Sequence, residues 1–206
     1  MPIPKFTTLM VFPLLLMLAG CDATPTATVK EAPKPVEAVT GQSALYKMYQ
    51  VAHSGWAPDA QVLSCISVHL AEVPQVAGKA GAWQATFTSD SLGKKRSYSY
   101  AVVETEGLHK DVFAGQEESW SGKQGQESSF LIQAASVDTD KAYKTALEQA
   151  GDYDKKSPGM NISFLLEKTP KFPDPAWRVV WGESVGTSNF SVYVDASTGA
   201  FLEKMR

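Results

Sequence analysis

Apolar and polar positions follow the same order twice along this chain, with helical spacing first and strict alternation afterwards. Apolar side chains recur every three or four residues at 45–52 and again at 142–150, a spacing that predicts two amphipathic helices. Each helical stretch is followed by alternating ones, notably 82–87 and 176–181. A period of two with β-branched and aromatic residues indicates strands. We therefore expect a helix followed by several strands in each half of the chain.

Some positions in these elements can be specified further. Ser43 and Asp140 stand at the starts of the two helical patterns and are residue types that cap a first turn through a side-chain oxygen. The alternation after the first helix is expected to place five side chains on one face of a strand: Val62, Ser64, Ile66, Val68 and Leu70. Four aromatic side chains are expected to form the cores beneath the helices: Trp83, Phe87, Trp177 and Trp181.

A hairpin is predicted at the end of each half. In the first half, 98–103 and 108–113 flank a turn near Glu106-Gly107. In the second half, 190–195 runs into the turn Ala196-Ser197-Thr198-Gly199 and the last strand follows at 200–204. Glycine at the end of that turn supplies the positive φ that such loops need.

The two halves also align by sequence. Residues 82–87 match 176–181 at a spacing of 94 residues, and the same spacing aligns 97–101 with 191–195. The helix beginnings match at a spacing of 97 residues. The alternative is a chance similarity between two amphipathic stretches. A duplicated unit of one helix and three or four antiparallel strands predicts an α+β fold, in which each helix packs across a curled sheet.

The end of the chain resembles the PepSY family. The resemblance rests on Trp177-Arg178-Val179 and on the run Val192 to Phe201, where a strand ends in Asp-Ala and a polar pair and glycine turn into the last strand. It covers residues 138–205 and is weaker over 43–114, where the turn is Glu104-Thr105-Glu106-Gly107. The resemblance implies two tandem cystatin-like units that bind or inhibit peptidases and carry no catalytic set.

The beginning of the chain is typical of a bacterial lipoprotein signal. Lys5 gives a positive start, 9–18 is largely apolar, and Leu18-Ala19-Gly20-Cys21 matches the lipobox. The apolar run is shorter than the roughly 20 residues that span a bilayer. We expect 1–20 to be a signal peptide and Cys21 to carry the lipid, whose two or more acyl chains anchor a protein stably. The alternative is a plain secretory signal with a chance cysteine.

The residue after the cysteine bears on the location. Asp22 resembles the signal that keeps enteric lipoproteins in the inner membrane. The expected location is therefore the periplasmic side of a bacterial membrane, with the inner membrane favoured and the outer membrane as the alternative.

Two polar stretches predict the domain boundaries. Residues 21–41 are rich in Pro, Ala and Thr and cannot bury enough surface to fold, so they are expected to form a disordered stalk. Residues 115–129 are rich in Gly and Ser and are expected to be a polar linker. The first PepSY-like repeat would then occupy 42–114 and the second 130–206.

Charge and cysteine content argue against two features, a nucleic-acid partner and a disulfide bond. The formal net charge is −3, and no basic patch is visible, which argues against nucleic acid as a partner. Lipidation of Cys21 leaves Cys65 without a partner for a disulfide. Cys65 is therefore expected to be a small buried apolar side chain.

The candidate chemistry in the sequence does not assemble into a catalytic site. Ser184 lies in Gly182-Glu183-Ser184-Val185-Gly186, which fits a nucleophile elbow, but the following residues are predicted to be strand and not the helix that the elbow requires. The three histidines, His53, His69 and His109, all precede that serine. Aspartates at 138, 140, 152 and 154 lack the glycine and distal glutamate of a calcium loop. No enzyme activity, metal or cofactor is predicted.

A non-enzymatic, membrane-tethered binding module is the function that these observations favour. Its partners would be the membrane, through the lipid, and a protein such as a peptidase or an envelope assembly. Trp56, in a predicted turn before Ala57-Pro58-Asp59, is the best candidate for an exposed aromatic that contacts this partner. One alternative is a small-ligand carrier, with a cleft between the helix and the curled sheet or between the two units. A less favoured alternative is an unrecognised hydrolase.

Overall fold

The structure, a computed structural model, describes residues 36–122, 128–156 and 158–205. All of them belong to one of the two units into which the chain divides, Pro35–Arg206. The predicted signal peptide, the lipidation site Cys21, the sorting residue Asp22 and most of the predicted stalk lie outside the described residues.

The first half of the described chain contains one long helix and four main strands. A two-residue strand β1 (Val39–Thr40) leads into helix α1 (Gly41–Gly55), and a second short strand, β3 (Lys79–Ala80), pairs with β1. The main strands are β2 (Gln61–Val68), β4 (Ala82–Ser89), β5 (Lys94–Ala101) and β6 (Asp111–Ser119).

The second half repeats this order after a short 3₁₀ turn, η1 (Ile132–Ala134). Helix α2 (Thr139–Ala150) is followed by a five-residue helix, α3 (Asp152–Lys156), which has no counterpart in the first half. The strands are β7 (Ile162–Glu167), β8 (Ala176–Trp181), β9 (Phe190–Asp195) and β10 (Phe201–Met205).

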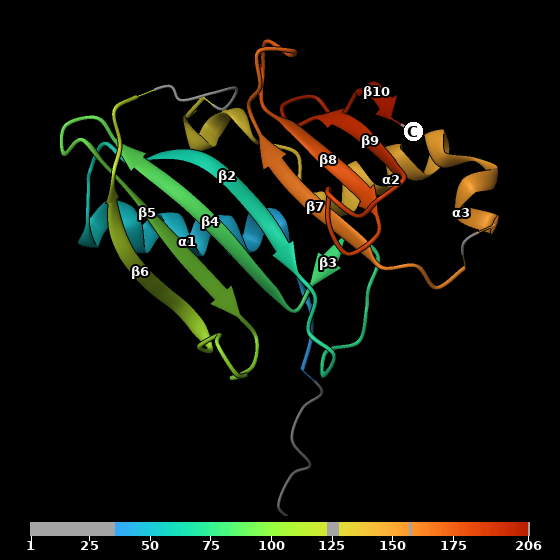
Figure 1. Cartoon of the computed structure of the whole chain (residues 1–206), viewed down its shortest axis with the longest axis horizontal. Coiled ribbons are helices and arrows are strands. Elements are labelled where there is room, and N and C mark those ends of the chain that lie inside the picture. Colours follow the sequence, from blue (N-terminus) through green and yellow to red (C-terminus); the bar gives the residue numbers. More distant parts are fainter. Residues whose placement is uncertain (1–35, 123–127, 157, 206) are drawn as a thin grey trace, which may run out of the picture. The chain divides into compact units, whose positions relative to one another are not determined.

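The eight main strands form one antiparallel sheet in the order β10-β9-β8-β7-β2-β4-β5-β6 (Figure 1). The first main strand of the first half, β2, pairs with the first strand of the second half, β7, and Cys65 of β2 stands opposite Leu166 of β7. The α+β class predicted from the sequence is therefore confirmed. The strands of the two halves were expected to form two sheets, but they share one continuous sheet. Strand β2 would be an edge strand of a sheet made by the first half alone, and β7 of one made by the second, so their pairing satisfies the backbone groups of both edges.

Both long helices cover the same face of this sheet, α1 near β4 and β5 and α2 near β8 and β9 (Figure 1). One hydrophobic core runs beneath them and contains the four aromatic side chains predicted for it, each at most 1% exposed. At its centre the rings of Trp83 and Trp177 meet edge to face, with centroids 6.3 Å apart. Their indole N–H groups donate to the carbonyls of Val39 and Val137, just before α1 and α2.

The helix starts differ from those predicted at Ser43 and Asp140. Helix α1 begins at Gly41 and α2 at Thr139, and the two N-termini meet. The amide of Gly41 donates to the hydroxyl of Thr139 at 2.8 Å, and the amide of Gln42 donates to Asp138 Oδ1 at 3.0 Å. Asp138 Oδ1 also accepts from the amide of Thr139 at 2.7 Å. A local pattern could not predict this, because α1 takes its caps from the other half of the chain.

Strand β2 also departs from the predicted alternation. A bulge between Val62 and Ser64 inserts an extra residue, so that Cys65, and not Ser64, follows Val62 into the core. Ser64 and Ile66 consequently lie on the face of the sheet that the helices leave uncovered.

The predicted linker 115–129 is partly strand. Strand β6 continues to Ser119, and Trp120 beyond it is buried. The strand is held there by pairing with β5 and by Arg96, whose Nε donates to the carbonyl of Gly115 at 2.8 Å. Up to Ser119 the polar composition therefore belongs to a solvent-exposed edge strand. Residues 123–127 of the predicted linker lie outside the described residues.

Candidate functional site

The uncovered face of the sheet carries a row of side chains that crosses every strand. The register of the strands aligns one residue from each of them, from β10 to β6: Glu203, Tyr193, Arg178, Leu165, Ile66, Gln84, Ser99 and Phe113. The middle of the row is apolar. Tyr193 on one side is covered by the ring of Phe172, at 5.2 Å between centroids, whereas Phe113 on the other side is 48% exposed.

A shallow hollow of about 290 Å³ lies at the Phe113 end of this row. Its walls come from β2, β4, β5 and β6 and carry hydroxyl and carboxamide groups from Ser64, Gln84, Thr86, Ser97 and Ser99. Apolar surface comes from Ile66, Leu108 and Phe113. None of the described residues that line the hollow carries a charge, so the site suits neutral polar and apolar groups.

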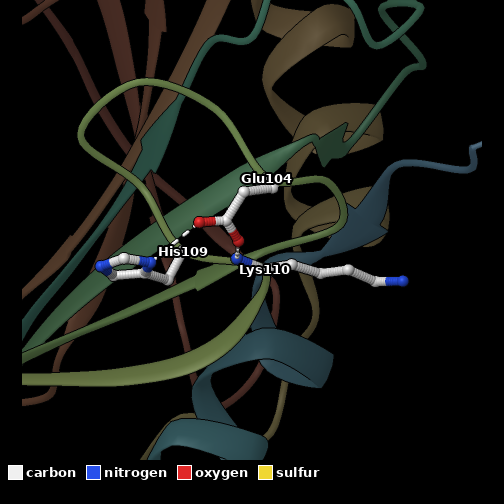
Figure 2. A network of polar contacts seen from close by, with 3 residues as sticks. All are labelled: Glu104, His109 and Lys110. Carbon is white, nitrogen blue, oxygen red and sulfur yellow. Dashed lines mark hydrogen bonds and ion pairs between the residues drawn. The ribbon is translucent and has the colours of Figure 1, made fainter.

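The hairpin arm between β5 and β6, residues 102–110, forms one wall of the hollow. Glu104 fixes its shape, as Figure 2 shows: one carboxylate oxygen accepts from the amide of Lys110 at 2.7 Å, and the other lies 2.9 Å from Nδ1 of His109. The hydrogen bond from Lys110 and the contact with His109 lower the pKa of Glu104. The ring of His109 packs on Phe113, at 4.5 Å between centroids.

Trp56, the predicted partner contact, is not the exposed aromatic that the sequence suggested. It is partly buried against the core, and its ring lies 6.4 Å from that of Tyr98. Its indole N–H donates to Glu117 of β6 at 2.8 Å. The turn at 56–60 therefore packs against the sheet, and Phe113 is the more exposed aromatic.

The remaining candidates from the sequence lie apart from the hollow. Cys65 is fully buried, as predicted, and burial raises the pKa of its thiol. Ser184 stands in a loop between β8 and β9, as predicted, with its hydroxyl 3.0 Å from that of Thr187. His53 is exposed and stacks on Tyr49, and His69 is exposed just beyond β2.

The aspartates considered for calcium do not gather. Asp138 serves as the cap of α2, and Asp154 accepts from the indole of Trp181 at 2.9 Å. Within the described ranges, no group of three or more potential ligands stands close enough to hold a metal ion.

A second pocket, also of about 290 Å³, opens on the helix side of the sheet, beside α2. Tyr143 of α2, Asp154 of α3 and Phe164 of β7 line it, together with the loop 75–79 from the first half. Burial raises the pKa of Tyr143, and the negative charge of Asp154 adds to the effect.

The hollow on the uncovered face was not predicted from the sequence. The alternating polar residues of β4 and β5, such as Gln84 and Ser99, were visible in the sequence. Alternation shows that they face away from the core but does not show that neighbouring strands gather them into a hollow.

No known family model matches this chain, and no curated protein matches it. Among solved structures, the chain is similar to a protein of Clostridium difficile 630 described as a "putative lipoprotein", at 9% identity and a TM-score of 0.45, covering 78% of this chain and 91% of that one. A likeness of this extent carries no conclusion about function. Within the described part of the chain, every helix is too short or too polar to cross a membrane.

Proposed function

We propose that this protein is a membrane-tethered binding module without enzymatic activity. The tether is supported by the lipobox ending at Cys21 and by the stalk composition of 21–41. The binding role is supported by the uncovered face of the sheet, where a hollow with an exposed Phe113 lies beside the edge strand β6. This hollow is the observation that carries the proposal.

The body of the protein is proposed to be a pair of PepSY-like, cystatin-like repeats. Each half has one long helix followed by four main strands. In each half a tryptophan of the second main strand donates to the carbonyl two residues before the helix begins. The turn between β9 and β10 is part of the sequence that resembles the PepSY family. In it, Asp195 accepts hydrogen bonds from the amides of Ser197 and Thr198, so the aspartate of this turn has a structural role.

The partner is proposed to be a protein that presents an extended segment, as a peptidase or a subunit of an envelope assembly can. An extended segment can pair with an exposed strand edge while its side chains enter neighbouring pockets. Strand β6 supplies such an edge, nine residues long, and Phe113 on it also lines the hollow. A neutral segment fits the uncharged lining best.

Photo-crosslinking in living cells tests the binding surface. A benzoyl-phenylalanine at position 113 of the full chain is expected to form an adduct with a specific protein. The same group at Leu147, which is 37% exposed on the outer face of α2, is the matched control. Equal adducts from both positions, or none from position 113 in a protein that is abundant and membrane-bound, would refute the proposed surface.

The tether and the lack of catalysis are tested separately. Cys21→Ser is expected to move the protein from the membrane fraction to the soluble periplasmic fraction, because the lipid acceptor is gone. Retention of the variant in the membrane would contradict the lipid anchor.

Covalent labelling of Ser184 by a fluorophosphonate would contradict the non-enzymatic assignment.

A small-ligand carrier is the second candidate function. It is favoured by the pocket beside α2, whose volume is near the lower limit of about 300 Å³ for ligand sites and whose lining combines aromatic and ionisable side chains.

A further inference from the structure

Helices α1 and α2 differ at the position where α2 lines the pocket. The fifth residue of α1 is Leu45, which is fully buried, and the fifth residue of α2 is Tyr143, which is only partly buried. A polar phenol thus replaces an aliphatic core residue. The ring centroid of Tyr143 lies 6.4 Å from that of Phe164 and 6.5 Å from that of Trp181, and Tyr143 also lines the pocket.

Polar groups of this pocket have bonding capacity to spare. The hydroxyl of Tyr143 makes no hydrogen bond with any residue in the described ranges. Asp154 uses Oδ1 to accept from the indole of Trp181, and that bond holds the carboxylate against the buried core. Its second oxygen receives no hydrogen bond from the described residues. A hydrogen-bond donor on a ligand could donate to the hydroxyl oxygen of Tyr143 and to the second carboxylate oxygen of Asp154.

The pocket also holds charges of both signs that do not neutralise each other. Lys79 of β3 lines it along with Asp154, and neither forms an ion pair with another described residue. Charged side chains in a partly enclosed site favour a ligand that brings the complementary charge to each. The complement of an unpaired ammonium and an unpaired carboxylate is a zwitterion.

Apolar side chains complete the lining. Phe164 and Ile162 of β7 lie beneath the pocket on the core side, while Val76 and Met160 at its rim are 43% and 38% exposed. A ligand with an apolar side chain would bury this surface, which is favourable in proportion to the area removed from water. The volume of about 290 Å³ limits such a ligand to a small one.

We propose that this pocket binds an apolar amino acid or the zwitterion of a short apolar peptide. The ligand ammonium pairs with Asp154 and approaches the hydroxyl of Tyr143, its carboxylate pairs with Lys79, and its side chain packs on Phe164 and Ile162. This inference deepens the small-ligand candidate and does not depend on the binding surface at Phe113.

Isothermal titration calorimetry of the full chain, purified in detergent, tests the inference with L-phenylalanine and with L-alanyl-L-phenylalanine. At least one of the two is expected to bind, and the comparison separates a free amino acid from a peptide. Phenethylamine, which lacks the carboxylate, and 3-phenylpropionate, which lacks the amine, are each expected to bind about tenfold more weakly or not at all, because one charge pair is lost.

Variants locate the binding in this pocket. Asp154→Asn keeps an oxygen for the indole of Trp181, and Lys79→Gln keeps a side chain of similar length; each is expected to weaken binding about tenfold. Asp152→Asn makes the same charge change on the exposed side of α3 and is expected to leave binding unchanged. Absence of binding by both probes, equal binding of phenethylamine, or an equal loss in Asp152→Asn would overturn the inference, while a crosslink at position 113 would still stand.

Discussion

Gly41 is the first residue of α1, and a side chain there would meet three others at once. A Cβ at this position would lie 2.7 Å from Cγ2 of Thr139 and 2.8 and 2.9 Å from the Cη2 atoms of Trp177 and Trp83. All three neighbours are buried in the shared core and cannot move aside without disturbing it.

Gly41→Ala is therefore expected to lower the free energy of unfolding by about 1–3 kcal/mol, the usual cost of overpacking a core. The measurement is urea denaturation followed by circular dichroism. Gly55→Ala is the matched control, because a Cβ at the end of the same helix meets nothing within 4 Å. Alanine there is expected to be neutral or to stabilise by up to about 1 kcal/mol. Equal effects of the two substitutions would show that close packing at Gly41 is not the cause.

Asp195 makes stability depend on pH. Burial opposes its ionisation, but hydrogen bonds from Ser197 and Thr198 outweigh burial, so the pKa of Asp195 lies below its usual value in the folded protein. A lowered folded-state pKa contributes stability above the unfolded pKa, near 3.9, and that contribution is lost as the pH falls further.

Asp195→Ala is expected to cost about 1–3 kcal/mol at pH 7, because several hydrogen bonds to a charged group are lost. The difference from wild type should shrink as the pH falls below about 4. Urea denaturation between pH 7 and pH 2.5 measures it, with the exposed Asp174→Ala as control. A difference that stays constant over this range would mean that ionisation of Asp195 does not contribute.

At the scale of elements, the junction of α1 and α2 explains why each helix begins where it does. The hydroxyl of Thr139 accepts from the amide of Gly41 and donates to the carbonyl of Gly78 at 2.6 Å. One buried side chain thus joins the first turn of α1, the start of α2 and the loop before β3. Removal of its hydroxyl would leave backbone groups of two elements unpaired in a buried place.

Thr139→Val keeps the shape of the side chain and removes the hydroxyl, and it is expected to destabilise the fold by about 1–3 kcal/mol. Thr145→Val makes the same change later in α2, where a partly buried hydroxyl donates to the carbonyl of Gly199 at 3.0 Å. The control should lose less, because it leaves a single acceptor near solvent. Thermal unfolding of both variants measures the two losses of stability. Equal losses would show that the Thr139 hydroxyl does not stabilise the junction of α1 and α2 more than an ordinary hydrogen bond does.

At the scale of the whole described unit, both halves share one sheet and one core. Phe164 of β7 shows this best: it is 1% exposed, and its ring lies 6.0 Å from that of Trp83 in the first half and 6.4 Å from that of Tyr143 in the second. Because the core is continuous across β2 and β7, we expect the halves to unfold together.

Phe164→Ala is expected to cost about 3–5 kcal/mol through the cavity that it leaves. Hydrogen exchange should show reduced protection of core amides in both halves, in β4 as well as in β8. Phe201→Ala, at a 40% exposed position in β10, is the control and should leave both patterns nearly unchanged. Loss of protection confined to 130–206 would show that the halves unfold independently.

Several features of this protein follow from local sequence. The helices, the aromatic core positions such as Trp83 and Trp177, the buried Cys65 and the last hairpin were all predictable, because periodicity and turn chemistry act within a few residues. The lipobox at Cys21 remains a prediction from sequence, outside the described residues.

Other features arise only when distant segments meet. The caps of α1 come from Asp138 and Thr139, almost a hundred positions away, so no local pattern marks Gly41 as the helix start. The bulge at Val62 reverses the faces of β2, and a one-residue shift is enough to do so. The hollow beside Phe113 and the pocket beside Tyr143 likewise gather side chains from four or more elements.

Local sequence is thus sufficient for the element types, their order along the chain and the four predicted aromatic core positions, since each depends on neighbours along the chain. Three features emerge only in the folded structure: β2 pairs with β7, both long helices lie on one face of the sheet, and they leave the opposite face uncovered. The physical reason is that strand pairing and site formation depend on contacts between residues far apart in sequence, which periodicity does not encode.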